Sequence, residues 1–376
     1  MTTRRPRRYL LSVVFDKYLL EKAREWVDQG RPLVLATITR IRGSSSQPLG
    51  ARMVIADDEE FVGSVSGGCV ERDVTLQAEQ VRAGGTPRLL EYSKVENTEL
   101  EVGLNCDGTI DVLLEPVTPT LLEQLERPAG QTLLTRYRTP DGQAVWDLEH
   151  RVVQSDGAAA GSVAPSDAPV SRVTNTDEGL WVELSEPRVR SPLLLIFGAA
   201  TVAYPLSTLG RTMGFRVVVA DPRNTYARGE QFPDAHEVIC AWPRELPQRL
   251  GTGPDGLGTR ASVVSLTHET RFEDDLFRTL MTVPRVSYIG CMGKRARHTE
   301  REARQTESGF DLSVLPPVHT PIGLDIGGKA PEDIALSIMA EIQATRNGRS
   351  GEPLSDRTAA AMFSSFVPPG ASGRRV

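Results

Sequence analysis

The chain has 376 residues, a net charge of −6 and an isoelectric point of about 5.6, and 39% of its residues are hydrophobic. These totals are typical of a folded protein that is long enough for two domains. The acidic balance argues against a nucleic-acid binder, because phosphate contacts need a basic face. No apolar run approaches the roughly 18 residues that are needed to span a bilayer.

The first residues, MTTRRPRRYLLSVVF, resemble the start of a twin-arginine or secretory signal. The apolar segment is only Tyr9 to Phe15, however, and no small-residue cleavage site follows it. We interpret the stretch as a basic beginning before a helix over 15–30, and we expect a cytoplasmic protein with no membrane contact.

The first half mixes helices and strands, and we assign residues 1–190 to an N-terminal α/β domain. Apolar runs bounded by turn residues predict strands at 31–41, 51–58, 60–67, 87–93, 109–117 and 180–187. Helical spacing predicts helices at 69–85 and 119–127, and a hairpin is expected over 132–150. The Ala/Ser/Gly/Pro-rich segment 154–172 is expected to be a flexible insertion.

The second half alternates strand and helix, which is typical of a parallel sheet with crossover helices. We assign residues 191–348 to a Rossmann-like C-terminal domain and 349–376 to a disordered tail. The predicted strands are 192–199, 215–222, 235–243, 261–268 and 285–292, and the last helix is 330–348.

The segment from Leu193 to Asp221 has the layout of a dinucleotide-binding strand, turn, helix and strand. The fingerprint is degraded, because Gly198-x-Ala200-x-x-Ala203 replaces the usual glycines and Ala200 stands where glycine clears the pyrophosphate. Asp221 is placed to bind ribose hydroxyls. A sheet whose small turn residues only pack the helix is the alternative.

Four cysteines, at positions 69, 106, 240 and 291, are too widely spread for a zinc knuckle or a disulfide framework. Cys69 follows Gly67 and Gly68 and precedes a helix, so free amides and the helix dipole would favour its thiolate. The acid that follows it, Glu71, is interpreted as a helix-start residue. Cys240 and Cys291 are interpreted as buried packing residues.

Several motifs taken together resemble the XdhC/CoxI family, the accessory factors of xanthine dehydrogenase. The motifs are ATITRIRGSSSQPLGARMVI, GSVSGGCVERDV and GLNCDGTIDVLLEPV in the first half, and VVSLTHE, YIGCMGKRARHTERE and PIGLDIGGKAPEDIALSIMAEI in the second. The resemblance covers most of the chain. Family members often have G-x-G-H at the Rossmann turn and G-x-G-C-G-G around the second cysteine, and this chain departs from both.

The resemblance implies a protein that binds molybdenum cofactor, supports its sulfuration beside a cysteine desulfurase, and delivers it to a xanthine-dehydrogenase- or CO-dehydrogenase-type molybdenum hydroxylase. Such a carrier need not be an enzyme, and we expect a homo-oligomer. The catalytic or sulfur-carrying candidates are Cys69 and Cys106, and Cys69 is also the metal-ligand candidate. The cofactor-binding candidates are Ser45, Gln47, Gly50, Arg52, Gly67, Gly68, Gly198, Ala200, Asp221, His268 and Asp325. We expect the cofactor in a cleft between the domains.

Two other functions remain open on the sequence alone. The first is an NAD(P)-dependent oxidoreductase that uses Asp221 for the ribose, although no hydride-partner constellation is evident. The second is a scaffold that contacts the target enzyme and holds no cofactor.

Overall fold

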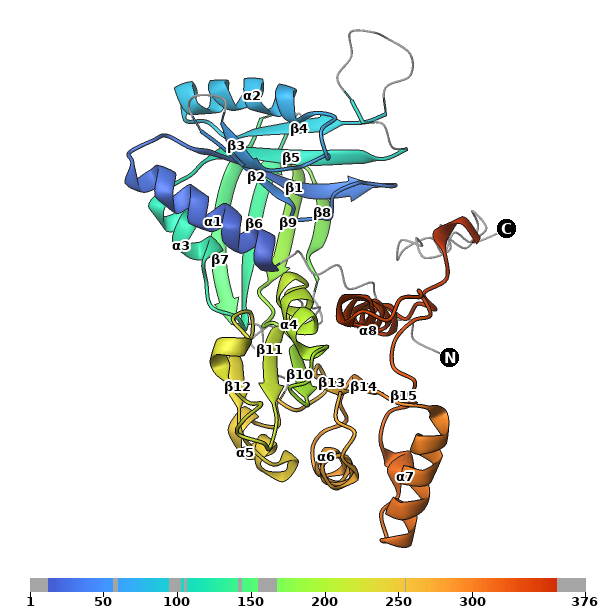
Figure 1. Ribbon diagram of the computed structural model, residues 1–376. Helices are drawn as coiled ribbons and strands as arrows, with labels where there is room; N and C mark the ends of the chain where they lie inside the picture. The colour runs from blue at the N-terminus through green and yellow to red at the C-terminus, as the bar shows by residue number, and fades with distance from the viewer. Residues whose placement is uncertain are drawn as a thin grey trace, which may run out of the picture. The chain divides into compact units, whose positions relative to one another are not determined.

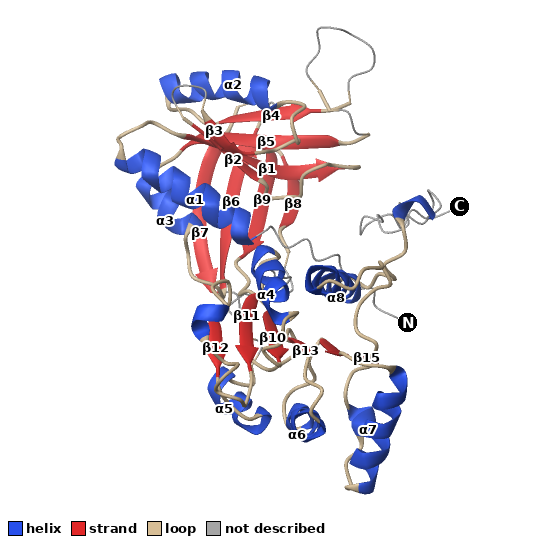
Figure 2. Cartoon of the chain, viewed as in Figure 1, coloured by secondary structure: helices blue, strands red, loops and turns tan. Residues whose placement is uncertain are grey.

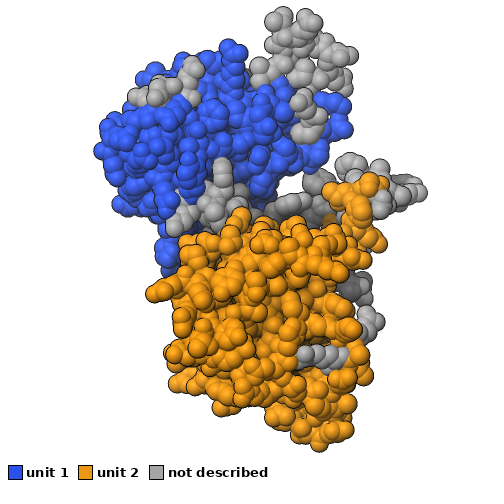
Figure 3. Space-filling model, viewed as in Figure 1, with its two compact units in different colours: residues 1–191 blue, residues 192–376 orange. Residues whose placement is uncertain are grey.

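The computed structural model describes residues 13–56, 60–94, 103–104, 107–140, 144–154, 168–253 and 255–356. The chain divides into two compact units, Met1–Ser191 and Pro192–Val376, which are referred to as unit 1 and unit 2. Unit 1 is built on antiparallel sheets and unit 2 on a parallel one (Figures 1 and 2), which confirms the predicted fold class. Figure 3 shows the two units in different colours. No helix among the described residues is long and apolar enough to span a membrane.

The first sheet of unit 1 is antiparallel and has the strand order β3-β2-β1-β5-β4. Its strands are β1 (Val34–Arg42), β2 (Arg52–Ile55), β3 (Phe61–Gly63), β4 (Arg88–Tyr92) and β5 (Thr109–Pro116). Helix α2 (Glu71–Gly84) covers one face, because Val74, Ala78 and Val81 recur at helical spacing and are fully buried there. The helix ends at Gly85, whose left-handed φ of 67° suits glycine.

Two helices pack on the opposite face of this sheet, α1 (Val13–Asp28) and α3 (Pro119–Leu125). The start of α3 is fixed by its sequence: the Thr118 hydroxyl accepts a hydrogen bond from the amide of Leu121 at 3.1 Å, and Pro119 occupies the first turn. Leu121, Leu122 and Leu125 are the residues that α3 buries.

The second sheet of unit 1 has the order β7-β6-β9-β8. Its strands are β6 (Gln131–Thr139), β7 (Trp146–Gln154), β8 (Val170–Thr176) and β9 (Gly179–Pro187). The predicted hairpin is present as the antiparallel pair β6 and β7. The predicted insertion 154–172 is too long, because Gln154 ends β7 and Val170 begins β8. Strand β8 was not predicted, because its residues are mostly exposed and polar and show no alternation of apolar and polar side chains. Residues 155–167 of the predicted insertion lie outside the described residues.

Polar side chains join the two sheets of unit 1. The Arg52 guanidinium on β2 lies 2.6 Å from the Glu186 carboxylate on β9. The Glu186 side chain is buried, and only 11% of the Arg52 side chain is exposed. The Thr39 hydroxyl on β1 lies 2.7 Å from the hydroxyl of Tyr137 on β6. Buried charges are tolerated only when they are paired, so these contacts fix which strands of the two sheets face each other.

Unit 2 contains a six-stranded parallel sheet in the order β12-β11-β10-β13-β14-β15. Its strands are β10 (Leu193–Phe197), β11 (Arg216–Ala220), β12 (Glu237–Ile239), β13 (Ser262–Ser265), β14 (Tyr288–Cys291) and β15 (Val318–His319). In sequence order this is 3-2-1-4-5-6, the doubly wound arrangement, with its switch point between β10 and β13. The short strand β15 was not predicted.

Helices cover both faces of the parallel sheet, as crossover connections require. They are α4 (Ala203–Thr212), α5 (Leu246–Leu250), α6 (Thr270–Met281) and α8 (Pro331–Arg346). Helix α7 (Arg295–Glu307) is joined to α6 by the buried ion pair of Arg301 with Glu273. Alternate residues of β10 enter two separate cores: Leu193, Leu195 and Phe197 pack with α5 and α6, whereas Leu194 and Ile196 pack with α4 and α8. This double burial explains the continuous apolar run in the sequence. Residues 349–356 of the predicted disordered tail 349–376 are described and include a short 3-10 helix, η4 (Leu354–Asp356). The rest of the tail lies outside the described residues.

The buried ion pair of unit 1 yields a prediction. Replacing Glu186 with glutamine leaves the Arg52 guanidinium buried without a counter-charge, so we expect Glu186→Gln to lower the free energy of unfolding by about 3 kcal/mol. Urea denaturation followed by circular dichroism measures the change. The matched control is Glu126→Gln, which removes the same charge from the exposed Arg24–Glu126 pair and should cost less than about 1 kcal/mol. Equal losses in the two variants would contradict the assignment.

Candidate functional site

The Gly-Gly-Cys bend of unit 1 lies between strand β3 and helix α2. Gly67 and Gly68 have φ values of 80° and 113°, which side-chain-bearing residues rarely adopt, and both are exposed. Cys69 is partly buried and packs against the core beneath α2. The helix itself begins at Glu71. The two glycines therefore let the chain reverse direction immediately before the cysteine.

The carboxylate of Glu71 lies at the centre of this bend and is buried. One of its oxygens, Oε1, accepts hydrogen bonds from the Ser64 hydroxyl at 2.5 Å and from the amides of Val65, Ser66 and Gly67 at 2.8–3.1 Å. The other, Oε2, accepts from the amide of Gly68 at 2.9 Å and from the Ser66 hydroxyl. The loop thus forms a ring of donors around a carboxylate that belongs to its own chain.

These hydrogen bonds determine the charge state of Glu71. Burial by itself raises the pKa of the carboxyl group, but hydrogen bonds from Ser64 and Ser66 outweigh it and bring the pKa down to about 2. From the sequence, we expected the loop amides to stabilise the Cys69 thiolate. The structure corrects that point, because the amides on either side of the glycine pair donate to Glu71 instead.

The Gly43–Gly50 loop, which holds the cofactor-binding candidates Ser45, Gln47 and Gly50, meets this bend. The Ser46 hydroxyl donates a hydrogen bond of 2.5 Å to the carbonyl of Ser66. A Cβ atom placed on Gly67 would lie 3.7 Å from the Ser46 hydroxyl and 4.0 Å from the Gln47 amide nitrogen. The structure therefore brings Gln47 close to Gly67, as a shared site requires.

The third motif of unit 1 also reaches the Gly43–Gly50 loop. A Cβ atom on Gly108 would lie only 1.7 Å from the carbonyl oxygen of Ser44, and one on Gly43 would lie 2.9 Å from the carbonyl oxygen of Asp107. The backbones can approach this closely only because both positions are glycine. Cys106, the second sulfur candidate, lies outside the described residues.

The remaining candidates of unit 1 have structural partners. The Ser45 hydroxyl accepts from the amide of Gln47 at 3.3 Å, and the Gly50 amide donates to the carbonyl of Ile38 at 2.9 Å. The charge of Arg52, another cofactor-binding candidate, is compensated by Glu186. Their roles in cofactor binding stay predictions.

In unit 2 the predicted nucleotide turn connects β10 to α4. Gly198 has a φ of 101°, and a Cβ atom there would lie 2.8 Å from the amide nitrogen of Thr267, at the end of the neighbouring strand β13. Glycine is thus required at 198 for the close approach of two strand ends. Ala200 is partly exposed, and its carbonyl accepts from the amide of Ala203 as α4 begins.

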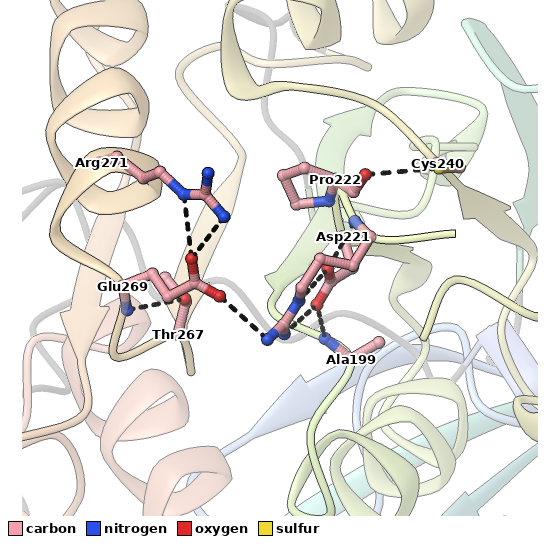
Figure 4. Close-up of polar contacts among 8 residues, drawn as sticks. Ala199, Asp221, Pro222, Cys240, Thr267, Glu269 and Arg271 are labelled. Atoms are coloured by element: carbon pink, nitrogen blue, oxygen red, sulfur yellow. Dashed lines mark hydrogen bonds and ion pairs between the residues drawn. The ribbon is translucent and has the colours of Figure 1, made fainter. Parts of the chain in front are cut away.

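Asp221, the expected ribose ligand, is buried, and its carboxylate already accepts hydrogen bonds from groups of the same chain (Figure 4). Its carboxylate accepts from the amide of Ala199 at 3.0 Å, from the amide of Arg223 at 2.9 Å, and from the Arg223 guanidinium at 2.8 and 2.9 Å. Burial raises the pKa of Asp221, but the hydrogen bonds from Arg223 outweigh it and the pKa falls below its ordinary value. A ribose would have to displace Arg223.

A second carboxylate extends this network. Glu269 lies between two guanidinium groups, at 3.1 Å from that of Arg223 and 2.8 Å from that of Arg271 (Figure 4). His268, beside it at the carboxyl edge of the sheet, is exposed. Asp325, in the loop before α8, is also exposed.

Two cysteines of unit 2 differ in accessibility. Cys291 is fully buried among apolar residues, as predicted. Cys240 was expected to be buried but is exposed, because it lies just after the last residue of β12. Its thiol lies 3.7 Å from the carbonyl oxygen of Pro222. Among the described residues, no group of three or more histidine, cysteine or acidic side chains is arranged to hold a metal ion.

Sequence reasoning missed the functions of Ser64 and Ser66, and it treated Glu71 only as a favourable first-turn acid. A signal was available, because hydroxyl residues that precede a helix with an acid in its first turn are the usual elements of a capped helix start. The role of Arg223 as the partner of Asp221 carried no such signal.

Known proteins share sequence with most of the chain. The profile of the XdhC and CoxI family matches residues 26–93, and that of the XdhC Rossmann domain matches residues 194–342. The chain is 29% identical over 333 residues to a Bacillus subtilis protein named as a probable xanthine dehydrogenase subunit, covering 83% of this chain and 93% of the relative. It is 24% identical over 335 residues to the Escherichia coli molybdenum cofactor insertion chaperone PaoD, covering 87% and 88%.

A solved structure agrees with these matches. The crystal structure of a protein from Bacillus halodurans, described as a xanthine dehydrogenase, superposes with a TM-score of 0.66 at 28% sequence identity. The likeness covers 93% of this chain and 99% of the other.

The low pKa of Glu71 gives a pH-dependent prediction. Its folded-state pKa of about 2 lies below the ordinary value of 4.5, so its contribution to stability is complete at neutral pH and decreases as the pH falls. We expect Glu71→Gln to have a lower free energy of unfolding than the unmodified chain at pH 7. The difference between the two free energies should decrease by about 1 kcal/mol at about pH 3.5. Urea denaturation at both pH values measures it.

The matched control is Glu79→Gln, an exposed glutamate on the same helix. Its free energy of unfolding should stay close to that of the unmodified chain at both pH values. The assigned charge state of Glu71 would be contradicted if the stability difference between Glu71→Gln and the unmodified chain did not change with pH.

Proposed function

Because this chain belongs to the XdhC and CoxI family, we propose that it binds molybdenum cofactor and delivers it to a molybdenum hydroxylase of the xanthine dehydrogenase or CO dehydrogenase type. The name of the relative PaoD, an insertion chaperone for this cofactor, supports the proposal along 87% of the chain. The cofactor is cargo here, and the chain need not catalyse a reaction itself.

The observation that carries the proposal is the meeting of three family motifs in unit 1. The Gly43–Gly50 loop contacts both the Gly-Gly-Cys bend and the segment at Asp107 and Gly108, although the three are separate in sequence. The meeting point offers exposed glycines, hydroxyls and a side-chain amide, and the partly buried Cys69 follows the two glycines directly. Hydroxyl and amide groups suit a pterin and its phosphate, and a thiolate is a soft ligand for a thiophilic metal.

The donor set fits a cargo that is held mainly by its organic part. The described residues contain no cage of metal ligands, and the soft ligand that they offer near the meeting point is Cys69. A site with one soft ligand and several hydrogen-bonding groups can hold a cofactor and still release it. Release is what delivery to a second protein requires.

Sulfuration of the cofactor is the second part of the proposal, with a cysteine desulfurase as the partner. In that step the Cys69 thiolate would attack the terminal sulfur of the partner's persulfide. The sulfur–sulfur bond breaks, the partner's cysteine leaves as a thiolate, and the sulfur remains on Cys69 as a persulfide with no net oxidation. Cys69 would then act as sulfur carrier rather than as metal ligand.

The carrier proposal predicts a defined effect of Cys69. We expect anaerobic titration with molybdenum cofactor to give saturable binding that weakens about tenfold or more in Cys69→Ala, since the loss of one ligand or strong contact costs at least about 1.4 kcal/mol. The matched control is Cys240→Ala, which removes an exposed thiol from unit 2 and should leave the affinity unchanged. Equal affinities in all three proteins would contradict the assigned role of Cys69, whereas the absence of saturable binding to the unmodified chain would favour the cofactor-free scaffold.

The rival oxidoreductase makes the opposite prediction for unit 2. Asp221 already accepts hydrogen bonds from Ala199 and Arg223, so we expect no saturable binding of NADH or NADPH below about 1 mM. Nucleotide fluorescence during titration measures this. Micromolar binding that is lost in Asp221→Asn would support the oxidoreductase instead.

A further inference from the structure

We propose that Glu71 and Ser66 are positioning residues that set the orientation of Cys69. The inference rests on the proposed role of Cys69, and it concerns residues that neither touch the cargo nor carry sulfur. It starts from a connection between the buried carboxylate and the backbone of the cysteine.

The Ser66 hydroxyl is the connecting group. It donates a hydrogen bond to Oε2 of Glu71 and accepts two others, from the amide of Cys69 at 2.9 Å and from the amide of Val70 at 3.0 Å. A hydroxyl has one proton, so donation to the carboxylate leaves its lone pairs directed at the two amides. The charge on Glu71 therefore fixes the direction of the Ser66 hydroxyl, and Ser66 fixes the Cys69 backbone.

The glycine pair would be mobile without this connection. Gly67 and Gly68 have the widest backbone freedom of any residue, and a Cβ atom on Gly68 would meet nothing within 4 Å. Neighbouring side chains therefore leave open space beside Gly68. The hydrogen bonds from the amides of Gly67 and Gly68 to Glu71 hold this part of the loop, so the carboxylate determines where the following cysteine lies.

A neutral side chain at position 71 cannot replace the carboxylate. Glutamine has nearly the same shape, but its NH₂ group is a donor and would face the donors that surround Oε2. We therefore expect Glu71→Gln to release the bend while α2, which is held by its apolar face, stays folded. Ser66→Ala is the milder second variant, because it removes the connecting hydroxyl and leaves the carboxylate in place.

The first experiment needs no cofactor. The full chain is treated with N-ethylmaleimide, and modification of each cysteine is followed by peptide mass spectrometry. Cys69 is partly buried in the closed bend, so its modification should be about tenfold faster in Glu71→Gln and faster, to a smaller extent, in Ser66→Ala. The rate at the exposed Cys240 of unit 2 should be the same in every variant, and Glu79→Gln should behave as the unmodified chain.

The second experiment separates positioning from general destabilisation. If Glu71 acts through Cys69, the single variant Glu71→Gln should bind molybdenum cofactor about tenfold more weakly than the unmodified chain. The double variant Glu71→Gln, Cys69→Ala should bind it almost as well as Cys69→Ala alone. An equal loss in both backgrounds would overturn the inference, as would an unchanged Cys69 modification rate in folded Glu71→Gln. If the unmodified chain does not bind the cofactor, the proposed function fails, while the modification rates still test the positioning.

Discussion

A carboxylate that is buried from water must be surrounded by hydrogen-bond donors, and this constraint shapes the glycine turns of both units. In unit 1 the loop before α2 closes around Glu71, and in unit 2 the strand ends at Ala199 and Arg223 close around Asp221. In each case the donors come from backbone amides and from side chains a few residues away. The chain supplies its own anion where a glycine-rich turn would otherwise offer its amides to a ligand.

This constraint changes how the two turns are interpreted. A glycine-rich segment before a helix is usually taken as a site for a ligand anion, and that was the expectation for both turns. With the amides occupied, the bend in unit 1 is better interpreted as a rigid support for a side chain, namely Cys69. The turn in unit 2 joins the ends of β10, β11 and β13, so its glycine and its acid stabilise the carboxyl edge of the parallel sheet.

The sequence was sufficient for the elements whose residues are buried on a regular period. The continuous apolar run of β10 and the i, i+4 spacing of Val74 and Ala78 in α2 indicate their structures directly. Strand β8 could not be predicted, because a polar strand at a sheet edge gains its structure from pairing with β9. The site was predictable as a set of motifs, but the pairing of Arg52 with Glu186 joins residues 134 positions apart and leaves no local pattern.

Gly43 and Gly108 lie where two loops of unit 1 approach each other closely. Each lies against the backbone beside the other, at Asp107 and at Ser44, and neither leaves room for a side chain. Neither residue can therefore change unless the opposite loop is rebuilt as well. Across the family, the two glycines should be kept or lost as a pair, so that their co-occurrence would report the contact between the two loops in relatives of which only the sequence is known.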